Sequence, residues 1–121
     1  MDFASLVKIS ETPLDLNALN QSIQLGKGES GASVIFTGSV RVAEEEQGLT
    51  GMTLEHYPGM TESQLMNILQ AASVRWPLTN MRVVHRIGYL EPGEPIVFVG
   101  VCSLHRQSAF EAAEFIMDYL K

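Results

Sequence analysis

The feature that most constrains the fold of this chain is an apolar run near its C-terminus that leads directly into a helical pattern. The run extends from Ile96 to Leu104, reads IVFVGVCSL, and is followed by His105-Arg106 and then by helical spacing as far as Lys121. Consecutive apolar and β-branched residues predict a strand buried on both faces. A histidine and an arginine at the first turn of the next helix would join the unpaired N–H groups there, a combination typical of an anion site.

Length and charge exclude several classes of protein. The chain has 121 residues, 45% of them hydrophobic, which is enough for one domain with one core. Its fourteen acidic and eight basic residues give a net charge of −6, so it lacks the basic surface that binds nucleic acid or anionic lipid. No apolar stretch is long enough to cross a bilayer, and the residues from Met1 to Ser5 do not resemble a signal peptide. With one cysteine and no internal disulfide, we expect a cytoplasmic protein without membrane or nucleic-acid partners.

Strand and helix patterns alternate along the rest of the chain. We expect strands at residues 4–9, 32–40, 52–57, 81–87 and 96–104. Helical spacing runs from Pro13 to Gly26, from a capping-box sequence at 61–64 to Trp76, and from His105 onward. A Pro-Gly turn at 91–94 joins the last two strands as a hairpin. The expected core faces of the first and last helices are Leu16, Ala18, Leu19 and Ile23, and Ala112, Phe115, Ile116 and Tyr119.

This order, β-α-β-β-α-β-β-α, predicts an α+β fold in one domain, residues 1–121. We expect the helices to pack on one face of a largely antiparallel sheet. Several strands are apolar on both faces, which in so short a chain predicts that part of the sheet is covered by another subunit.

Candidate site residues lie at the ends of these elements. His105 and Arg106 would bind an anionic group, the arginine as a planar donor and the histidine as a donor or proton relay; a surface ion pair and a packed loop residue explain them equally well. Arg41 closes a strand through Thr37-Gly38-Ser39, where small residues admit a ligand, although a solvated strand end is also a common place for arginine.

Lys121 is explained by the helix dipole alone unless other information is added. The helix from Ser108 to Lys121 would be about 20 Å long at 1.5 Å per residue. Lys121 therefore does not easily share a site with His105 and Arg106 of its own chain. If these residues cooperate, we expect the site to be shared between subunits.

Other reactive residues give weaker patterns. His85-Arg86 lies inside a predicted strand, where structural pairing is the simpler interpretation. Cys102 continues an apolar strand and is interpreted as a small buried hydrophobic residue rather than a nucleophile with His105 as its base. His56, His85 and His105 have no metal-ligand spacing, so we expect no metal and no cofactor.

Five motifs in order resemble one known family, the large, catalytic subunit of molybdopterin synthase. They are Phe36–Arg41, Leu54–Met60, His85–Gly88, Gly93–Val97, and His105–Ala112 leading to Ile116–Lys121. The resemblance covers nearly the whole chain from Gly31 onward, and five ordered motifs are far more specific than any single dipeptide.

The resemblance implies an α/β hammerhead fold with an additional antiparallel sheet, and a central homodimer that binds a small ubiquitin-like sulfur-carrier subunit at each end to form a heterotetramer. It implies an enzyme that transfers sulfur from the carrier's C-terminal thiocarboxylate to cyclic pyranopterin monophosphate, forming the dithiolene of molybdopterin in molybdenum cofactor biosynthesis. The implied substrate-binding residues are Ser39, Val40, Arg41, His105 and Arg106, and the implied catalytic residue is Lys121.

Members of that family continue beyond this lysine with a Pro-x-Trp-Lys-Lys/Arg-Glu motif, which the 121 residues lack. Two other functions therefore stay open. One is a non-catalytic dimeric α+β module that binds an anionic metabolite or the carrier protein. The other is a hydrolase that depends on Cys102.

Overall fold

The computed structural model describes residues 1–24, 26, 28–41, 52–54 and 60–120. The helices and strands follow the predicted alternation, with two additional short elements. In chain order they are α1 (Phe3–Leu6), β1 (Val7–Ser10), α2 (Leu16–Ile23), β2 (Ala32–Ser39), β3 (Met52–Leu54), α3 (Met60–Arg75), β4 (Leu78–Arg86), β5 (Gly88–Leu90), β6 (Pro95–Ser103) and α4 (Arg106–Tyr119). The α+β class is confirmed. None of the described helices is both long and apolar enough to cross a bilayer.

The main sheet is built around β6. Its strand order is β1-β4-β6-β2, with β6 antiparallel to both neighbours and β1 parallel to β4. Val99 of β6 pairs with Val83 on one side and Phe36 on the other. Every residue from Val97 to Ser103 is buried, as the apolar run predicts. A second, two-stranded antiparallel sheet pairs β3 with β5 and corresponds to the additional sheet that the family resemblance implies.

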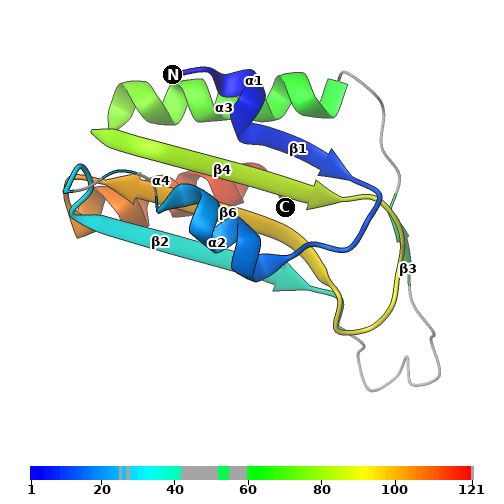
Figure 1. Cartoon of the computed structure of the whole chain (residues 1–121). Helices are drawn as coiled ribbons and strands as arrows, with labels where there is room; N and C mark the ends of the chain where they lie inside the picture. The colour runs from blue at the N-terminus through cyan, green and yellow to red at the C-terminus, as the bar shows by residue number, and fades with distance from the viewer. Residues whose placement is uncertain (25, 27, 42–51, 55–59, 121) are drawn as a thin grey trace.

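Helices cover both faces of the main sheet, so the expectation of helices on one face is wrong. On one face α3 and α4 pack against Val83, Val99 and neighbouring apolar residues. On the other face α2 lies across the sheet and contributes Ile23 to a smaller cluster with Phe98 (Figure 1). The close approach of α2 depends on Gly100, where an added Cβ would lie 2.8 Å from Cδ1 of Ile23. A glycine inside a strand here makes room for a helix.

The two additional elements explain where the predicted boundaries fail. The strand predicted at 4–9 begins as the short helix α1, because the Asp2 carboxylate accepts the Ala4 N–H at 3.2 Å and so caps a first turn. The hairpin predicted between β4 and β6 contains β5, since Gly88 turns the chain with a φ of 88°. Residues 61–64 lie within α3, which begins at Met60, and do not precede it as a cap. Residues 55–57 of the third predicted strand lie outside the described residues.

The predicted core faces are largely confirmed. In α3 the residues at helical spacing, three and four apart, are Leu65, Ile68, Leu69 and Ala72, which the sequence places on one apolar face, and all four are buried. In α4 Ala112 and Ile116 are buried, but Tyr119 is 61% exposed. Tyr119 instead packs edge-to-face on Phe115, which is partly buried against the core, with 5.5 Å between the ring centroids. Ala18 of α2 is also exposed, whereas Ile23 is buried.

Candidate functional site

The first group of predicted site residues, Ser39, Val40 and Arg41, lies where β2 leaves the main sheet. Ser39 is opposite Pro95, after a register shift that follows Gly38. Val40 is only 8% exposed, and its N–H donates to the Glu94 carbonyl at 2.9 Å. Arg41 is exposed. A buried, hydrogen-bonded residue thus precedes an arginine that is open to solvent.

A β-turn holds Val40 in place. The turn spans Glu91 to Glu94, closed by the Glu94 N–H donating to the Glu91 carbonyl at 3.1 Å. Gly93 has a φ of 89°, as a proline-glycine type II turn requires, so this predicted turn is confirmed. The Gly93 N–H donates to the Val40 carbonyl at 2.9 Å, which makes the contact between turn and strand reciprocal.

An ion pair between Arg86 and Glu94 stabilises this turn. Arg86 is 4% exposed, and its Nη1 lies 3.0 Å from Oε1 of Glu94. The other carboxylate oxygen of Glu94 accepts the Glu91 N–H at 2.7 Å. That backbone hydrogen bond, together with the Arg86 guanidinium, holds the pKa of Glu94 below its usual value against the opposing effect of burial. The interpretation of Arg86 as a structurally paired residue is confirmed.

The second group, His105 and Arg106, lies where β6 passes into α4. Ser103 ends the strand fully buried and donates its hydroxyl to the Pro77 carbonyl at 2.9 Å. His105 has an extended backbone, with φ −134° and ψ 146°, and is the N-cap of α4, but its side chain makes no capping hydrogen bond. Both His105 and Arg106 are exposed. This helix start therefore presents two solvent-facing donor side chains beside N–H groups that the N-cap side chain does not occupy.

The structure does not bring these two groups together within one chain. Strand pairing sets Ala32 opposite Ser103 at one end of β2 and Ser39 opposite Pro95 at the other. Between those ends β6 extends about 26 Å, at about 3.3 Å per residue. Figure 1 shows the end of β2 and the end of β6 at opposite ends of the sheet. Arg41 follows the first of these strands and His105 follows the second, so the two residues are too far apart to contact one phosphate group.

Helix α4 begins beside the second group and runs back across the sheet, opposite in direction to β6 (Figure 1). Its last turn is thus nearer the Arg41 end than its first turn is. Leu120 is the C-cap residue, with its N–H donating to the Met117 carbonyl at 3.0 Å. Lys121, the predicted catalytic residue, follows Leu120 in sequence and lies outside the described residues.

Cys102 is a buried residue of the core. It is 1% exposed, and its Sγ donates to the Ile23 carbonyl at 3.2 Å. Burial raises the pKa of the thiol, which is the opposite of what a thiolate nucleophile needs. The interpretation of Cys102 as a small buried hydrophobic residue is confirmed. Within the described residues, no group of three or more histidine, cysteine or acidic side chains is arranged to hold a metal ion.

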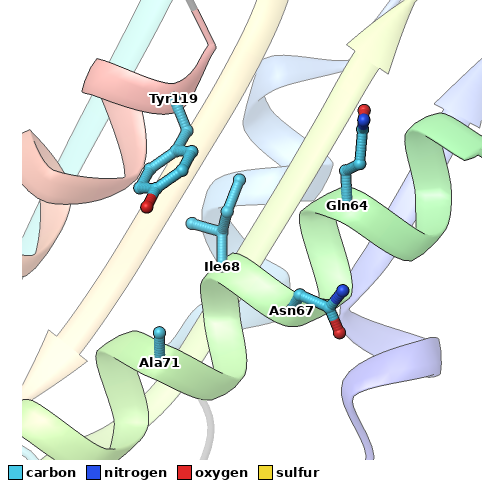
Figure 2. Close-up of a pocket in the computed structure, with 5 residues that line it drawn as sticks. All are labelled: Gln64, Asn67, Ile68, Ala71 and Tyr119. Carbon is cyan, nitrogen blue, oxygen red and sulfur yellow. The ribbon is translucent and has the colours of Figure 1, made fainter.

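A cavity that the sequence did not predict lies between α3 and α4. It has a volume of about 390 Å³ and is lined by Gln64, Asn67, Ile68, Ala71 and Tyr119. Figure 2 shows the Tyr119 ring facing Ile68 across this gap. Its lining carries no charged side chain, so it is chemically unlike either group of predicted anion-binding residues.

The sequence also did not predict the structural role of Glu94, which pairs with Arg86 in the turn that holds Val40. The glutamate belongs to the motif Gly93–Val97, which pointed to a family but gave no contact for its carboxylate. Only the fold shows that Glu94 pairs with Arg86 and that the same turn holds Val40.

Comparison with known proteins relates the chain to one family. The family model described as "MoaE protein" matches residues 9–121. The chain is 58% identical over 95 residues to a molybdopterin synthase catalytic subunit from Escherichia coli; the match covers 78% of this chain and 63% of that protein. The chain thus spans less than two thirds of that relative's length.

Solved structures share the fold. A molybdopterin biosynthesis MoaE protein from Burkholderia ambifaria superposes with a TM-score of 0.84 at 41% identity, covering 95% of this chain and 75% of that one. A complex of subunits 1 and 2 of molybdopterin-converting factor from Helicobacter pylori gives a TM-score of 0.80 at 21% identity, covering 96% and 77%. At that identity the second comparison shows the fold alone.

Proposed function

We propose that this chain, which belongs to the MoaE family, is the catalytic subunit of a molybdopterin synthase. The observation that carries the proposal is the family match over residues 9–121, which includes the exposed residues Arg41, His105 and Arg106. In a chain with a net charge of −6, the adjacent His105 and Arg106 at the start of a helix point to an anionic ligand.

The proposed reaction is sulfur transfer to cyclic pyranopterin monophosphate from the C-terminal thiocarboxylate of a small ubiquitin-like carrier. In each transfer the carrier's C–S bond breaks and the sulfur replaces an oxygen substituent on the pterin side chain. One displaced oxygen leaves as water, and the other stays on the phosphate as its cyclic ester opens to a monoester. In each transfer a further water molecule supplies the oxygen that completes the carrier's carboxylate. Two transfers give the dithiolene of molybdopterin.

The positions of Arg41 and His105 support a site shared between two copies of the chain. Each end of the main sheet carries only part of the proposed phosphate-binding set, because about 26 Å of strand separates the two parts. We propose that Ser39, Val40 and Arg41 of one copy face His105 and Arg106 of a second copy in a homodimer. Arg41 and Arg106 would bind the phosphate as planar donors, and His105 would donate a hydrogen bond or relay a proton.

Lys121 is proposed to act at the carrier's thiocarboxylate. An ammonium group beside that carbonyl would stabilise the oxyanion that forms during transfer, or would move a proton as sulfur leaves. The direction of α4 supports placing Lys121 with Arg41 of its own chain rather than with His105, since His105 is the N-cap of α4 and Lys121 follows the other end of the helix in sequence.

The proposed partner is the carrier subunit, one bound at each end of the homodimer to give a heterotetramer. The Helicobacter pylori neighbour is a complex of two subunits, which is consistent with this arrangement. The cytoplasmic location expected from the sequence remains a prediction.

A single-turnover assay with thiocarboxylated carrier and cyclic pyranopterin monophosphate tests the activity. We expect dithiolene product from the chain, and loss of product in Lys121→Ala and Arg41→Ala. Carrier binding without any product would instead assign the 121 residues a non-catalytic docking role.

Mixing two inactive variants tests whether the site is shared. A dimer formed by one Arg41→Ala chain and one His105→Ala chain contains one site with both residues intact. Random pairing should restore about a quarter of the wild-type activity. If the mixture stays as inactive as each variant alone, the site belongs to one chain. A mixture of Arg41→Ala with Lys121→Ala is the matched control. Both residues would belong to the same half of the site, so every site in a mixed dimer would carry one of the two changes, and this mixture should stay inactive.

A further inference from the structure

We propose that Arg86 and Glu94 are positioning residues that fix the direction in which Arg41 leaves β2. The role of Arg41 as a substrate ligand rests on the proposed function; the positioning itself rests on contacts among the described residues. The side chain of Arg86 is buried and that of Glu94 is partly buried, and they would act on Arg41 through the backbone that connects them to it.

Arg86 fixes two parts of the chain with one rigid group. Its Nη1 bonds the Glu94 carboxylate at 3.0 Å, and its Nη2 donates to the Tyr89 carbonyl at 2.9 Å. The guanidinium is planar, so these two bonds hold the turn and β5 at a set separation. The side chain of Arg86 is 5% exposed, and a charge so buried is strongly unfavourable unless it is paired. Glu94 is therefore held in one place.

Glu94 transmits that position to the turn. Its Oε2 accepts the Glu91 N–H at 2.7 Å, and its own N–H donates to the Glu91 carbonyl at 3.1 Å. Side chain and backbone of one residue thus close the same turn. Because Gly93 lies inside this closed turn, its N–H has a fixed direction, and this N–H is the one that reaches Val40.

The turn fixes Val40, and Val40 directly precedes Arg41. Two reciprocal hydrogen bonds, each 2.9 Å long, join Val40 to Gly93 and Glu94. The register shift after Gly38 ends the regular β2–β6 pairing just before this point. The turn therefore replaces the sheet as the support for the last residue before Arg41. A change in the turn would swing Arg41, because Arg41 directly follows Val40 in the chain.

The pair acts by geometry rather than by its electric field at Arg41. The opposite charges of Arg86 and Glu94 are 3.0 Å apart and largely cancel at a distance. Removing both charges would leave the net charge unchanged. Loss of the hydrogen bonds, by contrast, frees the turn. The expected effect is therefore that the backbone at Val40 and Arg41 becomes less ordered.

Amide hydrogen exchange followed by NMR tests the positioning without any assay of function. We expect Glu94→Ala to speed exchange at the Val40 and Gly93 amides by about tenfold or more, and to leave Val99 in the centre of β6 unchanged. Glu94→Gln keeps the size of the side chain and one acceptor oxygen, so it should give a smaller increase and serves if the alanine variant does not fold. Arg86→Lys keeps the charge but supplies a single point donor, and should resemble Glu94→Ala.

Matched controls separate this effect from general loosening. Glu91→Gln removes a carboxylate from the same turn but keeps its backbone N–H. Arg82→Lys changes an arginine on the same face of β4 whose Nη1 bonds the Ser5 carbonyl at 3.0 Å, far from the turn. Both should leave Val40 exchange unchanged. Unchanged exchange at Val40 in Glu94→Ala, or equal increases in the controls, would overturn the proposal.

A double-mutant cycle then connects the positioning to the ligand. We expect titration with cyclic pyranopterin monophosphate to show about tenfold weaker binding for Arg41→Ala and for Glu94→Ala, with the double variant no weaker than Arg41→Ala alone. Additive losses would mean that Glu94 acts independently of Arg41. If wild-type protein does not bind this compound, the proposed function fails while the exchange experiment still decides the positioning.

Discussion

Gly100 of β6 packs against Ile23 of α2, so closely that a Cβ on the glycine would be 2.8 Å from Cδ1 of the isoleucine. This relationship joins α2 to the centre of β6 and sets which face of the sheet that helix covers. It also defines a clash that a single methyl group creates and a second substitution relieves in part.

Gly100→Ala should destabilise the protein by about 1–3 kcal/mol, because the added methyl overpacks a closed contact. Ile23→Val deletes only Cδ1, the nearest of the atoms that the new Cβ meets. In the Gly100→Ala background this second change should recover part of the lost stability. Urea denaturation of the two single variants and the double variant measures the coupling, and strictly additive losses would show that the two positions do not touch.

Leu69→Ala should cost about 2–5 kcal/mol, since Leu69 is fully buried between α3 and the sheet and its truncation leaves a cavity. Val74→Ala is the control on the same helix, because Val74 is 83% exposed and its truncation should change stability by less than about 0.5 kcal/mol. Chemical denaturation of both variants compares them. A similar loss in both would contradict the described orientation of α3.

Cys102 should react slowly with thiol reagents in the folded protein. Burial both raises the pKa of its thiol and blocks access to it. The rate of labelling by a chromogenic disulfide at pH 8 should be at least about a hundredfold lower in buffer than in denaturant. Fast labelling of the native state would show that the strand around Cys102 opens. Cys102→Ala should retain the proposed sulfur transfer, and loss of that activity in a folded variant would favour a function that depends on the Cys102 thiol.

Protonation of Glu94 should make the protein less stable in acid, because the stabilising contribution of its carboxylate is then lost. Its pKa is lower in the folded state than in the unfolded state, so its contribution is fully present above the unfolded value near 4.5 and is lost as the pH falls through the folded pKa. The melting temperature of the wild type should therefore fall more steeply below about pH 4.5 than that of Glu94→Gln. Melting curves between pH 3 and pH 7 test this. Parallel acid limbs for the two proteins would mean that Glu94 does not contribute.

The sequence predicted elements whose signals are local. The boundary between β6 and α4 was found at His105 because a continuous apolar run changes there to helical spacing. The buried face of α3 followed from residues three and four apart. The turn at Glu91–Glu94 followed from proline and glycine in the positions that a type II turn requires.

Contacts between distant parts of the chain account for what the sequence missed. The face that α2 covers depends on Ile23 meeting Gly100, and no local pattern carries that information. The separation of Arg41 from His105 depends on strand register, which a list of motifs does not contain. The pairing of Arg86 with Glu94 spans an extra strand that is only three residues long, below the length at which alternation is recognisable.

The central place of β6 has a consequence for how the chain is made. Both β2 and β4 pair with β6, which is the last strand in the described sequence. During synthesis β2 leaves the ribosome with no partner strand in the main sheet, and β4 has only β1 beside it, until residues 95–103 have followed them. At about 5–20 residues per second, the interval from the end of β2 at Ser39 to the end of β6 at Ser103 lasts about 3–13 s, during which β2 is exposed to other nascent chains. Chaperone dependence in the cell should therefore exceed what the stability of the folded state suggests.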